Sequence, residues 1–343
     1  MRTIIAVPPL PRMSGGLAVL YQLAARLREL GREVALTSTD NTPGFATKAA
    51  EGFTLIPWET VAGRNTLASP FLRPDDTFLI SEGWPNMMAP ALAAKARVLV
   101  YAQSWIYIFS SLPQGTSWDH LPVTFLAVSH PVANFLKEMA GLPVTGILRP
   151  SVDHARFHPQ SAPGKTVRIA WMPRKNKALA EQIMQISQGL DRGGKPRVEW
   201  VEIRNMAPDD VAKTLASCHI FLATGFPEGC PLPPLEAMGS GCLVVGFSGF
   251  GGWDYMRQAL PGAYLPQLPF RPVPWAGNGL FASDGDVLEA SRLLVKAVDM
   301  VRQDDAQYHA IREQALLTAA AYSAADQREA VGTIWNGLEN RNS

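Results

Sequence analysis

The stretch Glu228-Gly-Cys-Pro-Leu-Pro-Pro-Leu-Glu236-Ala-Met-Gly-Ser-Gly-Cys places two carboxylates on either side of seven residues. It follows the apolar run 220–224, which predicts a buried strand. Because Pro233 and Pro234 suit the start of a helix, we expect Glu236 in its first turn and Glu228 in the preceding loop. Such a helix start presents free N–H groups and partial positive charge, which together suit a diphosphate. In the alternative reading, Glu236 only complements the helix dipole and Glu228 is a solvated loop charge.

Short apolar runs alternate with amphipathic stretches along the chain, as in parallel sheets covered by helices. We expect strands at 3–7, 34–37, 77–81, 98–101 and 125–128, and again at 167–172, 198–203, 220–224 and 243–247. Turn formers and polar residues between 151 and 164 mark a domain boundary. The predicted fold class is therefore α/β, with two Rossmann-like parallel-sheet domains that face each other across a cleft.

The composition is that of a globular protein with more than one core. The chain has 343 residues, of which 47% are hydrophobic and 18% are charged, enough for two domains. A net charge of +1 supplies no overall field, so we expect no nucleic-acid partner. The three cysteines show no CxxC spacing, which disfavours a disulfide framework and a zinc site. Every apolar stretch is too short or too interrupted to span a membrane, so we expect a cytoplasmic protein.

The segment that begins at Glu228 resembles the Glu-x7-Glu motif of family 4 retaining glycosyltransferases, which have the two-domain GT-B fold. The positions in register with that motif are Leu232-Pro233, Leu235-Glu236-Ala237-Met238, Gly241, Val244-Val245 and Gly251-Gly252. Cys230 and Pro231 depart from it, because the family often has Phe and Gly there. Gly15-Gly16 before an amphipathic helix, and the stretch 150–159, are also similar to the family's pattern.

The resemblance implies an acceptor-side domain at residues 1–160 and a nucleotide-sugar-binding domain at residues 161–323. A helix at about 324–343 is expected to pack back on the first domain. By the same resemblance, Glu228 orients the donor sugar, Glu236 binds the ribose, and Gln103 stands where many relatives have a histidine. The donor-binding residues that it implies are Gly15, Gly16, Gln103, Cys230, Pro231, Leu232, Pro233 and Glu236.

Basic residues gather in the loop Pro173-Arg174-Lys175-Asn176-Lys177, which joins a predicted strand to a predicted helix. A cation at a helix N-terminus opposes the macrodipole at a cost of roughly 0.3–1 kcal/mol, and a bound diphosphate would reverse that cost. The family carries an Arg and a Lys after this strand. Arg174 and Lys177 are the matches, with Lys175 as the alternative. With fixed cations, no metal-ligand spacing and no Asp-x-Asp motif, we expect neither a metal nor a cofactor.

The segment 104–118 is unusually aromatic for a connection, with Trp105, Tyr107 and Phe109. A role in the core is one reading. The other is an acceptor-binding loop or a peripheral contact with the inner face of a membrane. Glu82 and Trp84 end another predicted strand and are candidates for the acceptor side.

Together with the resemblance, these observations predict a retaining, metal-independent hexosyltransferase. It would move a hexose or deoxyhexose from a nucleotide-sugar donor to a glycan, glycolipid or small-molecule acceptor, in polysaccharide or glycoconjugate synthesis. Arg174 and Lys177 would stabilise the leaving diphosphate, and Glu228 would orient the sugar. Two alternatives stay open: a nucleotide-sugar epimerase or hydrolase on the same scaffold, and a non-catalytic nucleotide-sugar-binding protein.

Overall fold

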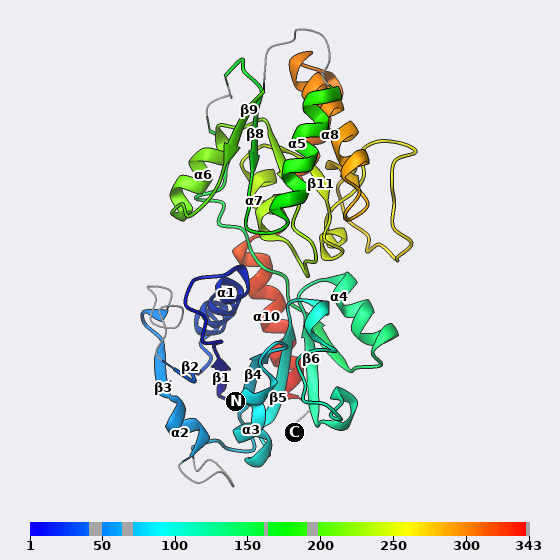
Figure 1. The fold of residues 1–343 in the computed structure, drawn as a ribbon. Helices are drawn as coiled ribbons and strands as arrows, with labels where there is room; N and C mark the ends of the chain where they lie inside the picture. Colours follow the sequence, from blue (N-terminus) through cyan, green and yellow to red (C-terminus); the bar gives the residue numbers. More distant parts are fainter. Residues whose placement is uncertain (41–49, 64–70, 161–163, 191–197, 341–343) are drawn as a thin grey trace. The chain divides into compact units, whose positions relative to one another are not determined.

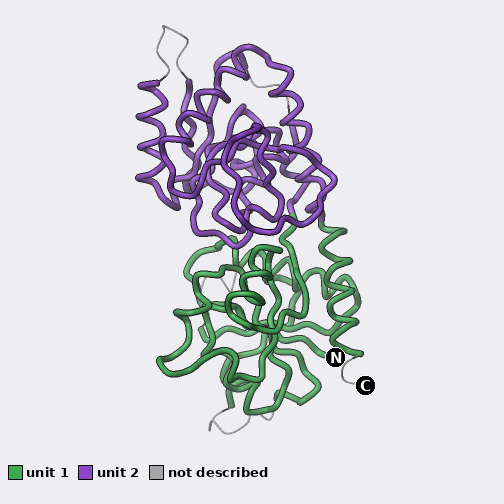
Figure 2. Tube along the Cα trace, turned by 90° about the vertical axis from the view of Figure 1, so that its right-hand side faces the viewer, with its two compact units in different colours: residues 1–151, 324–343 green, residues 152–323 purple. Residues whose placement is uncertain are grey.

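The computed structural model describes residues 1–40, 50–63, 71–160, 164–190 and 198–340. The chain forms two compact units, one of Met1–Ser151 with Ala324–Ser343 and one of Val152–Ser323 (Figure 2). The first unit ends earlier than the boundary that we expected at 160. The reason is that Val152 and Phe157 are buried in the core of the second unit, where the Val152 N–H donates to the Tyr322 carbonyl oxygen at 2.8 Å.

The first unit is built on a parallel sheet of seven strands in the order β3-β2-β1-β4-β5-β6-β7 (Figure 1). The strands are β1 (Thr3–Ala6), β2 (Val34–Ser38), β3 (Thr54–Pro57), β4 (Thr77–Ser81), β5 (Arg97–Ala102), β6 (Val123–Ala127) and β7 (Val144–Ile147). β1 and β4 are buried along their whole length, as apolar runs covered on both faces should be. The short helices α2 (Trp58–Ala62), α3 (Ala89–Ala93) and α4 (His130–Asn134) lie in the connections.

Two long helices of the first unit come from opposite ends of the chain and pack side by side (Figure 1). α1 (Gly15–Glu29) begins at Ser14, whose hydroxyl accepts a hydrogen bond from the Leu17 N–H at 3.2 Å. It ends before Gly31, which has a φ of +71° that favours glycine. α10 (Ala324–Glu339) is anchored by the buried Trp335, whose indole N–H donates to the Thr3 hydroxyl at 2.9 Å.

The second unit is built on a parallel sheet of five strands in the order β12-β11-β10-β8-β9. The strands are β8 (Arg168–Trp171), β9 (Glu199–Glu202), β10 (Ile220–Ala223), β11 (Leu243–Phe247) and β12 (Gly279–Ala282). Its helices are α5 (Lys177–Leu190), α6 (Pro208–Ala216), α7 (Leu232–Gly239), α8 (Val287–Arg302) and α9 (Ala306–Ala320). The prediction of an α/β protein with two parallel sheets is confirmed.

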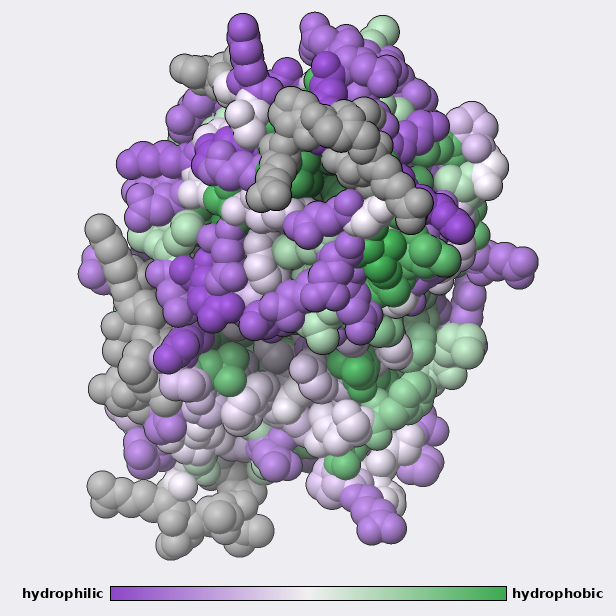
Figure 3. Space-filling model, turned by 45° about the horizontal axis from the view of Figure 1, so that its top comes forward, coloured by the Kyte–Doolittle hydropathy of each residue, from purple (hydrophilic) through white to green (hydrophobic). Residues whose placement is uncertain are grey.

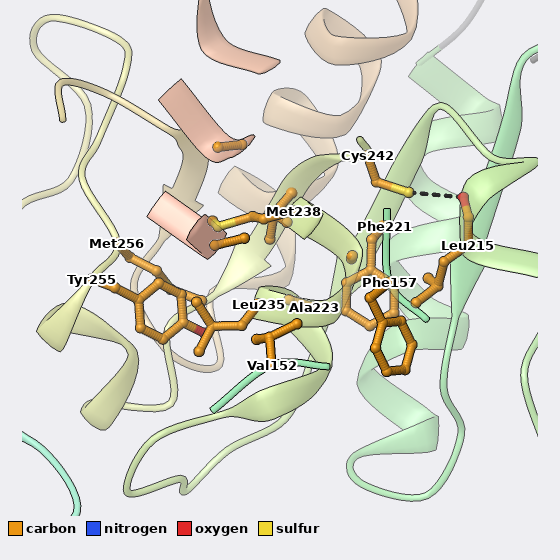
Figure 4. Packing of buried hydrophobic residues seen from close by; sticks show 14 of the residues in the cluster. Val152, Phe157, Leu215, Phe221, Ala223, Leu235, Met238, Cys242, Tyr255 and Met256 are labelled. Atoms are coloured by element: carbon orange, nitrogen blue, oxygen red, sulfur yellow. Dashed lines mark hydrogen bonds between the residues drawn. The ribbon is translucent and has the colours of Figure 1, made fainter. Parts of the chain in front are cut away.

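Strand β10 shows how one short run supplies both cores of the second unit. Phe221 and Ala223 pack in a cluster with residues of α6, α7 and α9 (Figure 4). Ile220 and Leu222 pack in a second cluster, with residues of α5 and α8. Since side chains of a strand alternate between faces, an uninterrupted apolar run is what a strand covered on both faces requires.

Three strands escaped prediction from the sequence, and all three lie at the edge of a sheet. β3, β7 and β12 have four residues each, and each contains a proline or a glycine. β3 and β7 are the two outer strands of the first sheet, and β12 is an outer strand of the second. An edge strand has one neighbour, and β3 and β7 are only partly buried, so neither needs the continuous apolar run that identifies a central strand, whereas β12 is buried and mostly apolar and this reason does not account for it.

None of the helices in the described part of the chain is long and apolar enough to cross a membrane. On the face of the molecule seen in Figure 3, hydrophilic residues predominate and hydrophobic residues form separate patches.

The fold predicts a large cost for truncating the anchor of α10. Trp335→Ala should lower the free energy of unfolding of the first unit by about 3–5 kcal/mol, because it leaves a cavity and an unpaired Thr3 hydroxyl. Hydrogen exchange of the amides of β1 and α1 reads the stability of this unit separately. Thr333→Ala, an exposed position on the same helix, is the matched control and should change it by less than about 0.5 kcal/mol. Similar effects of the two substitutions would contradict the role of Trp335 as the anchor of α10.

Candidate functional site

The two glutamates of the sequence motif follow strand β10. Glu228 lies in the loop between β10 and α7, as expected. Glu236 is not in the first turn of α7, so that expectation was wrong. The helix begins at Leu232, ahead of the proline pair, and this moves Glu236 into the second turn.

A close approach of two backbone segments holds the Glu228 loop in place. The Glu228 N–H donates to the Gly249 carbonyl oxygen at 2.8 Å, and the Gly251 N–H donates to the Glu228 carbonyl oxygen at 3.0 Å. A side chain at Gly251 would lie 1.9 Å from the Gly229 carbonyl oxygen, so only glycine fits. Gly251 is therefore needed to position Glu228.

A buried tyrosine fixes the start of α7. The Tyr255 hydroxyl donates to the carbonyl oxygen of Pro231, the residue before the helix, at 2.7 Å. Burial raises the pKa of Tyr255 well above its usual value, so this hydroxyl stays a donor. Nothing in the sequence motif pointed to Tyr255, and only its place shortly after Gly251-Gly252 could have suggested it.

The loop after β8 is tied to the loop after β10 by an asparagine that the sequence analysis did not single out. The Asn176 side-chain amide donates to the Thr224 carbonyl oxygen at 2.9 Å and to the Phe226 carbonyl oxygen at 2.8 Å. Asn176 has a φ of +55°, a conformation that asparagine tolerates better than most residues. An asparagine just before a helix start was the available signal.

Lys175, rather than Lys177, is the lysine beside Glu228. Its ammonium group lies 2.7 Å from the Glu228 Oε1 and also donates to the Pro227 carbonyl oxygen at 3.3 Å. The ammonium group of Lys177 lies 3.3 Å from the carboxylate of Glu181, one turn along the exposed face of α5. Arg174 is exposed and has no ion-pair partner among the described residues.

A small cavity of about 40 Å³ opens where these loops meet, at the carboxyl ends of β8, β10 and β11. Of the residues predicted for the site, it brings together Arg174, Glu228, Pro231 and Pro233, and it adds Lys175. The cavity lining does not include Lys177, Cys230, Leu232 or Glu236. Its remaining walls are Met172, Phe221, Leu222, Ala223, Thr224, Gly225, Pro234 and Phe247.

Three prolines limit what the start of α7 can donate. Proline has no N–H, so Pro231, Pro233 and Pro234 offer no donor. Leu232 and Leu235 retain an N–H at this end of the helix. The cations of the loop after β8 therefore supply most of the attraction that this cavity can exert on an anion.

Glu236 occupies a different environment from Glu228. Its carboxylate is half-buried and has no hydrogen-bond or ion-pair partner among the described residues. Burial raises the pKa of Glu236 to about 7, and the positive charge of Arg156 opposes the rise only in part. A carboxylate without a protein partner is free to accept hydrogen bonds from a ligand hydroxyl.

In the first unit, two predicted residues contact each other. The Gln103 side-chain amide donates to the Gly16 carbonyl oxygen at 3.1 Å, while the space beside Gly15 is open. The buried Glu82 carboxylate accepts the backbone N–H groups of Gln103 and Ser104 at 3.1 and 2.8 Å. Burial raises the pKa of Glu82 to about 7, and these hydrogen bonds oppose the rise. Glu82 therefore orders the start of the aromatic loop.

The aromatic loop, residues 104–118, supports in part each of its two interpretations, a role in the core and a surface contact. Ile108 and Trp118 are buried, and the Trp118 indole N–H donates to the Ile108 carbonyl oxygen at 2.8 Å. Tyr107 and Phe109 are 52% and 71% exposed. Part of the loop thus belongs to the core and part faces solvent. Among the described residues, no group of three or more His, Cys, Asp or Glu side chains is placed to hold a metal ion.

The chain resembles known proteins mainly in its fold. No protein-family model matches the chain. It is similar to an alpha-1,6-glucosyltransferase of Actinobacillus pleuropneumoniae serotype 7, with 33% identity over 94 residues, which are 27% of this chain and 28% of the relative. The matched part is thus under a third of the length of that relative.

Solved structures match over nearly the whole chain. A glycosyltransferase from Rickettsia africae has a TM-score of 0.68 at 14% identity, with 97% of this chain and 98% of that chain covered. HepE from Anabaena, solved with UDP and glucose, has a TM-score of 0.66 at 13% identity and covers 99% of each chain. The pneumococcal O-GlcNAc transferase GtfA, solved with UDP and GlcNAc, has a TM-score of 0.62 at 11% identity, with 97% and 99% covered. The fold is GT-B.

In this GT-B fold, the raised pKa of Glu236 makes the stability of the second unit depend on pH. In the unfolded chain the carboxyl group titrates near its ordinary value of 4.5, and in the folded chain near 7. The unfolded state therefore releases a proton first, and the folded state loses stability as the pH rises from about 4.5 to about 7. Below that range, both states are protonated and the contribution vanishes.

We therefore expect Glu236→Gln to remove this loss. At pH 8 the variant should be more stable than the unmodified protein by about 1–3 kcal/mol, and at pH 4 the two should agree. Hydrogen exchange of the α7 amides across this pH range measures the difference. Glu313→Gln, an exposed glutamate of α9, is the matched control. An unchanged pH dependence in Glu236→Gln would show that another group is responsible.

Proposed function

We propose that this chain is a retaining glycosyltransferase of family 4 that binds a nucleotide sugar on its second unit. The observation that carries the proposal is the pairing of Lys175 with Glu228 at 2.7 Å, in a cavity that Arg174 also lines. A cation pair beside a carboxylate, at the carboxyl ends of parallel strands, suits a ligand with both a diphosphate and hydroxyl groups. The Glu-x7-Glu spacing of Glu228 and Glu236 supports the family assignment.

The similar proteins support the donor class. HepE and GtfA were solved with UDP and a sugar, and the curated relative is a glucosyltransferase. We propose a UDP-linked hexose or deoxyhexose as the donor. The acceptor is a glycan, glycolipid or small molecule bound by the first unit, in polysaccharide or glycoconjugate synthesis on the cytoplasmic side.

In the proposed reaction, the charge of the leaving diphosphate is stabilised by Arg174 and Lys175. Lys175 is held by Glu228 and the Pro227 carbonyl oxygen before the donor arrives, so little reorganisation of this cation is needed when negative charge develops. This arrangement makes the reaction independent of a divalent metal. A donor phosphate that takes over Lys175 leaves the Glu228 carboxylate to accept hydrogen bonds from sugar hydroxyls. Glu236 accepts hydrogen bonds from the ribose diol.

Retention follows if the acceptor attacks the face of the sugar that the diphosphate leaves. We assign no side chain as the base. A phosphate oxygen of the donor lies on the same face and takes the acceptor proton as the glycosidic bond forms and the bond to the diphosphate breaks.

The two lysines of the basic loop provide a matched test of the donor site. Lys175→Ala should weaken UDP binding by about 10- to 100-fold, because a charge-assisted hydrogen bond contributes about 1.5–3 kcal/mol. Lys177→Ala should change it by less than about threefold, since its partner is an exposed residue of the same helix. Isothermal titration calorimetry without divalent metal measures both. A larger loss of UDP binding in Lys177→Ala than in Lys175→Ala would assign the diphosphate contact to Lys177. No binding of UDP, GDP, ADP or dTDP would refute the donor site.

Substitution of Glu228 separates catalysis from nucleotide binding. Glu228→Gln should lower the rate of sugar transfer at least about 100-fold while UDP binds within about threefold of normal, because Glu228 acts on the sugar. Glu181→Gln, which removes an exposed carboxylate, is the control and should transfer normally. Product analysis with and without acceptor excludes an epimerase or a hydrolase. Binding of UDP-sugar by the unmodified protein with no turnover would identify a non-catalytic binding protein.

A further inference from the structure

A groove of about 480 Å³ lies in the first unit, between strand β7 and helix α10. On one side it contacts Thr145, Gly146 and Ile147 of β7, and on the other the face of α10 that runs from Asp326 to Gly337. None of these residues belongs to the candidate donor site, which lies in the second unit. The groove therefore calls for an explanation that the proposed function does not supply.

The groove lies beside β7. It contacts three consecutive residues of β7, of which Thr145 and Ile147 point to one face of the sheet and Gly146, which has no side chain, faces Ile334 of α10. β7 is the last strand of its sheet, and in the described part of the chain it pairs with β6 alone. An edge strand presents N–H and C=O groups in the pattern that another extended chain can meet.

The helical wall matches an extended segment in length and shape. The residues of α10 in the groove recur at intervals of three and four from 326 to 337, which is one face of the helix. That face is about 16 Å long at 1.5 Å per residue, and about five residues of an extended chain cover the same distance. Ala330 and Gly337 contribute little or no side-chain bulk to the groove, and the missing side chain of Gly146 lets Ile334 of α10 pack against β7.

The charge on this wall indicates what kind of segment fits. Asp326 and Glu329 are exposed carboxylates that line the groove. Asp326 lies in the first turn of α10, where the helix dipole alone accounts for an acidic residue. Glu329 lies beyond the first turn and has no cation partner among the described residues. A lysine or arginine of a bound segment would supply that partner.

We propose that the groove is a docking site for a basic, extended segment of another protein, which adds to the edge of β7 as a further strand. The backbone of the segment pairs with β7, and its basic side chains meet Glu329 and Asp326. The site is separate from the proposed catalytic function and would persist if that function were refuted. It gives the first unit a means of association with a partner protein.

Synthetic peptides test the proposal on the full chain. The probe is a fluorescein-labelled heptapeptide that alternates valine and lysine and has blocked ends. We expect it to bind and to protect the backbone amides of residues 144–147 from hydrogen exchange. The same peptide with glutamate in place of lysine should not bind, and alternate N-methylation of the lysine peptide should abolish binding, since it removes the donors needed for strand pairing.

A charge swap supplies the decisive comparison. Glu329→Lys should lower the affinity for the lysine peptide by about tenfold and should allow the glutamate peptide to bind. Glu313→Lys on α9 should do neither. The proposal is overturned if no peptide protects β7, if the lysine and glutamate peptides bind equally, or if Glu329→Lys and Glu313→Lys behave alike. Protection of β7 that depends on protein concentration, with a dimer seen by light scattering, would assign the groove to a second copy instead.

Discussion

The contact between Gly251 and the Glu228-Gly229 backbone is the constraint on which the candidate donor site depends. Two backbone hydrogen bonds and the absence of a side chain at Gly251 bring the segment after β11 against the loop after β10. From there the chain turns so that Tyr255 reaches the carbonyl oxygen of Pro231. A single close approach thus fixes both the position of Glu228 and the start of α7. The lining of the cavity follows from these two positions.

The segment after β11 also contacts the residues at the two ends of the second unit. Asp254, which directly precedes Tyr255, is fully buried, and its carboxylate accepts a hydrogen bond from the Tyr322 hydroxyl and lies 3.5 Å from the Arg271 guanidinium. The carbonyl oxygen of Tyr322 in turn accepts the Val152 N–H. Buried polar groups that are fully paired fix one arrangement of the backbone. The loop that carries Glu228 and the two ends of the second unit are therefore parts of one hydrogen-bonded assembly.

The sequence was sufficient for the central strands of the fold and for the loop that carries Glu228, but not for the details of the candidate site. Central strands such as β4 and β11 are continuous apolar runs, and their bounds were predicted to the residue. Edge strands such as β7 have no such pattern. Motif spacing placed Glu228 in its loop, whereas the helix register of Glu236 depended on where α7 begins. Lys177 was preferred to Lys175 from the family resemblance, because position along the chain does not give the direction of a side chain. The i, i+4 spacing of Lys177 and Glu181 was the signal that favoured a helix-surface pair.

The prolines at the start of α7 explain why the cations matter in this chain. A helix start attracts anions through its free N–H groups and its partial charge. Pro231, Pro233 and Pro234 remove three of those donors but not the partial charge, because the later peptide dipoles of the helix remain aligned. An anion in the cavity then finds few directed hydrogen bonds from α7. Arg174 and Lys175 are charged groups of the lining that can provide them, and Asn176 holds their loop against the loop of Glu228. In the proposed donor site, recognition of a diphosphate would therefore depend on the geometry of the β8–α5 loop more than on α7, even though the recognisable motif lies on α7.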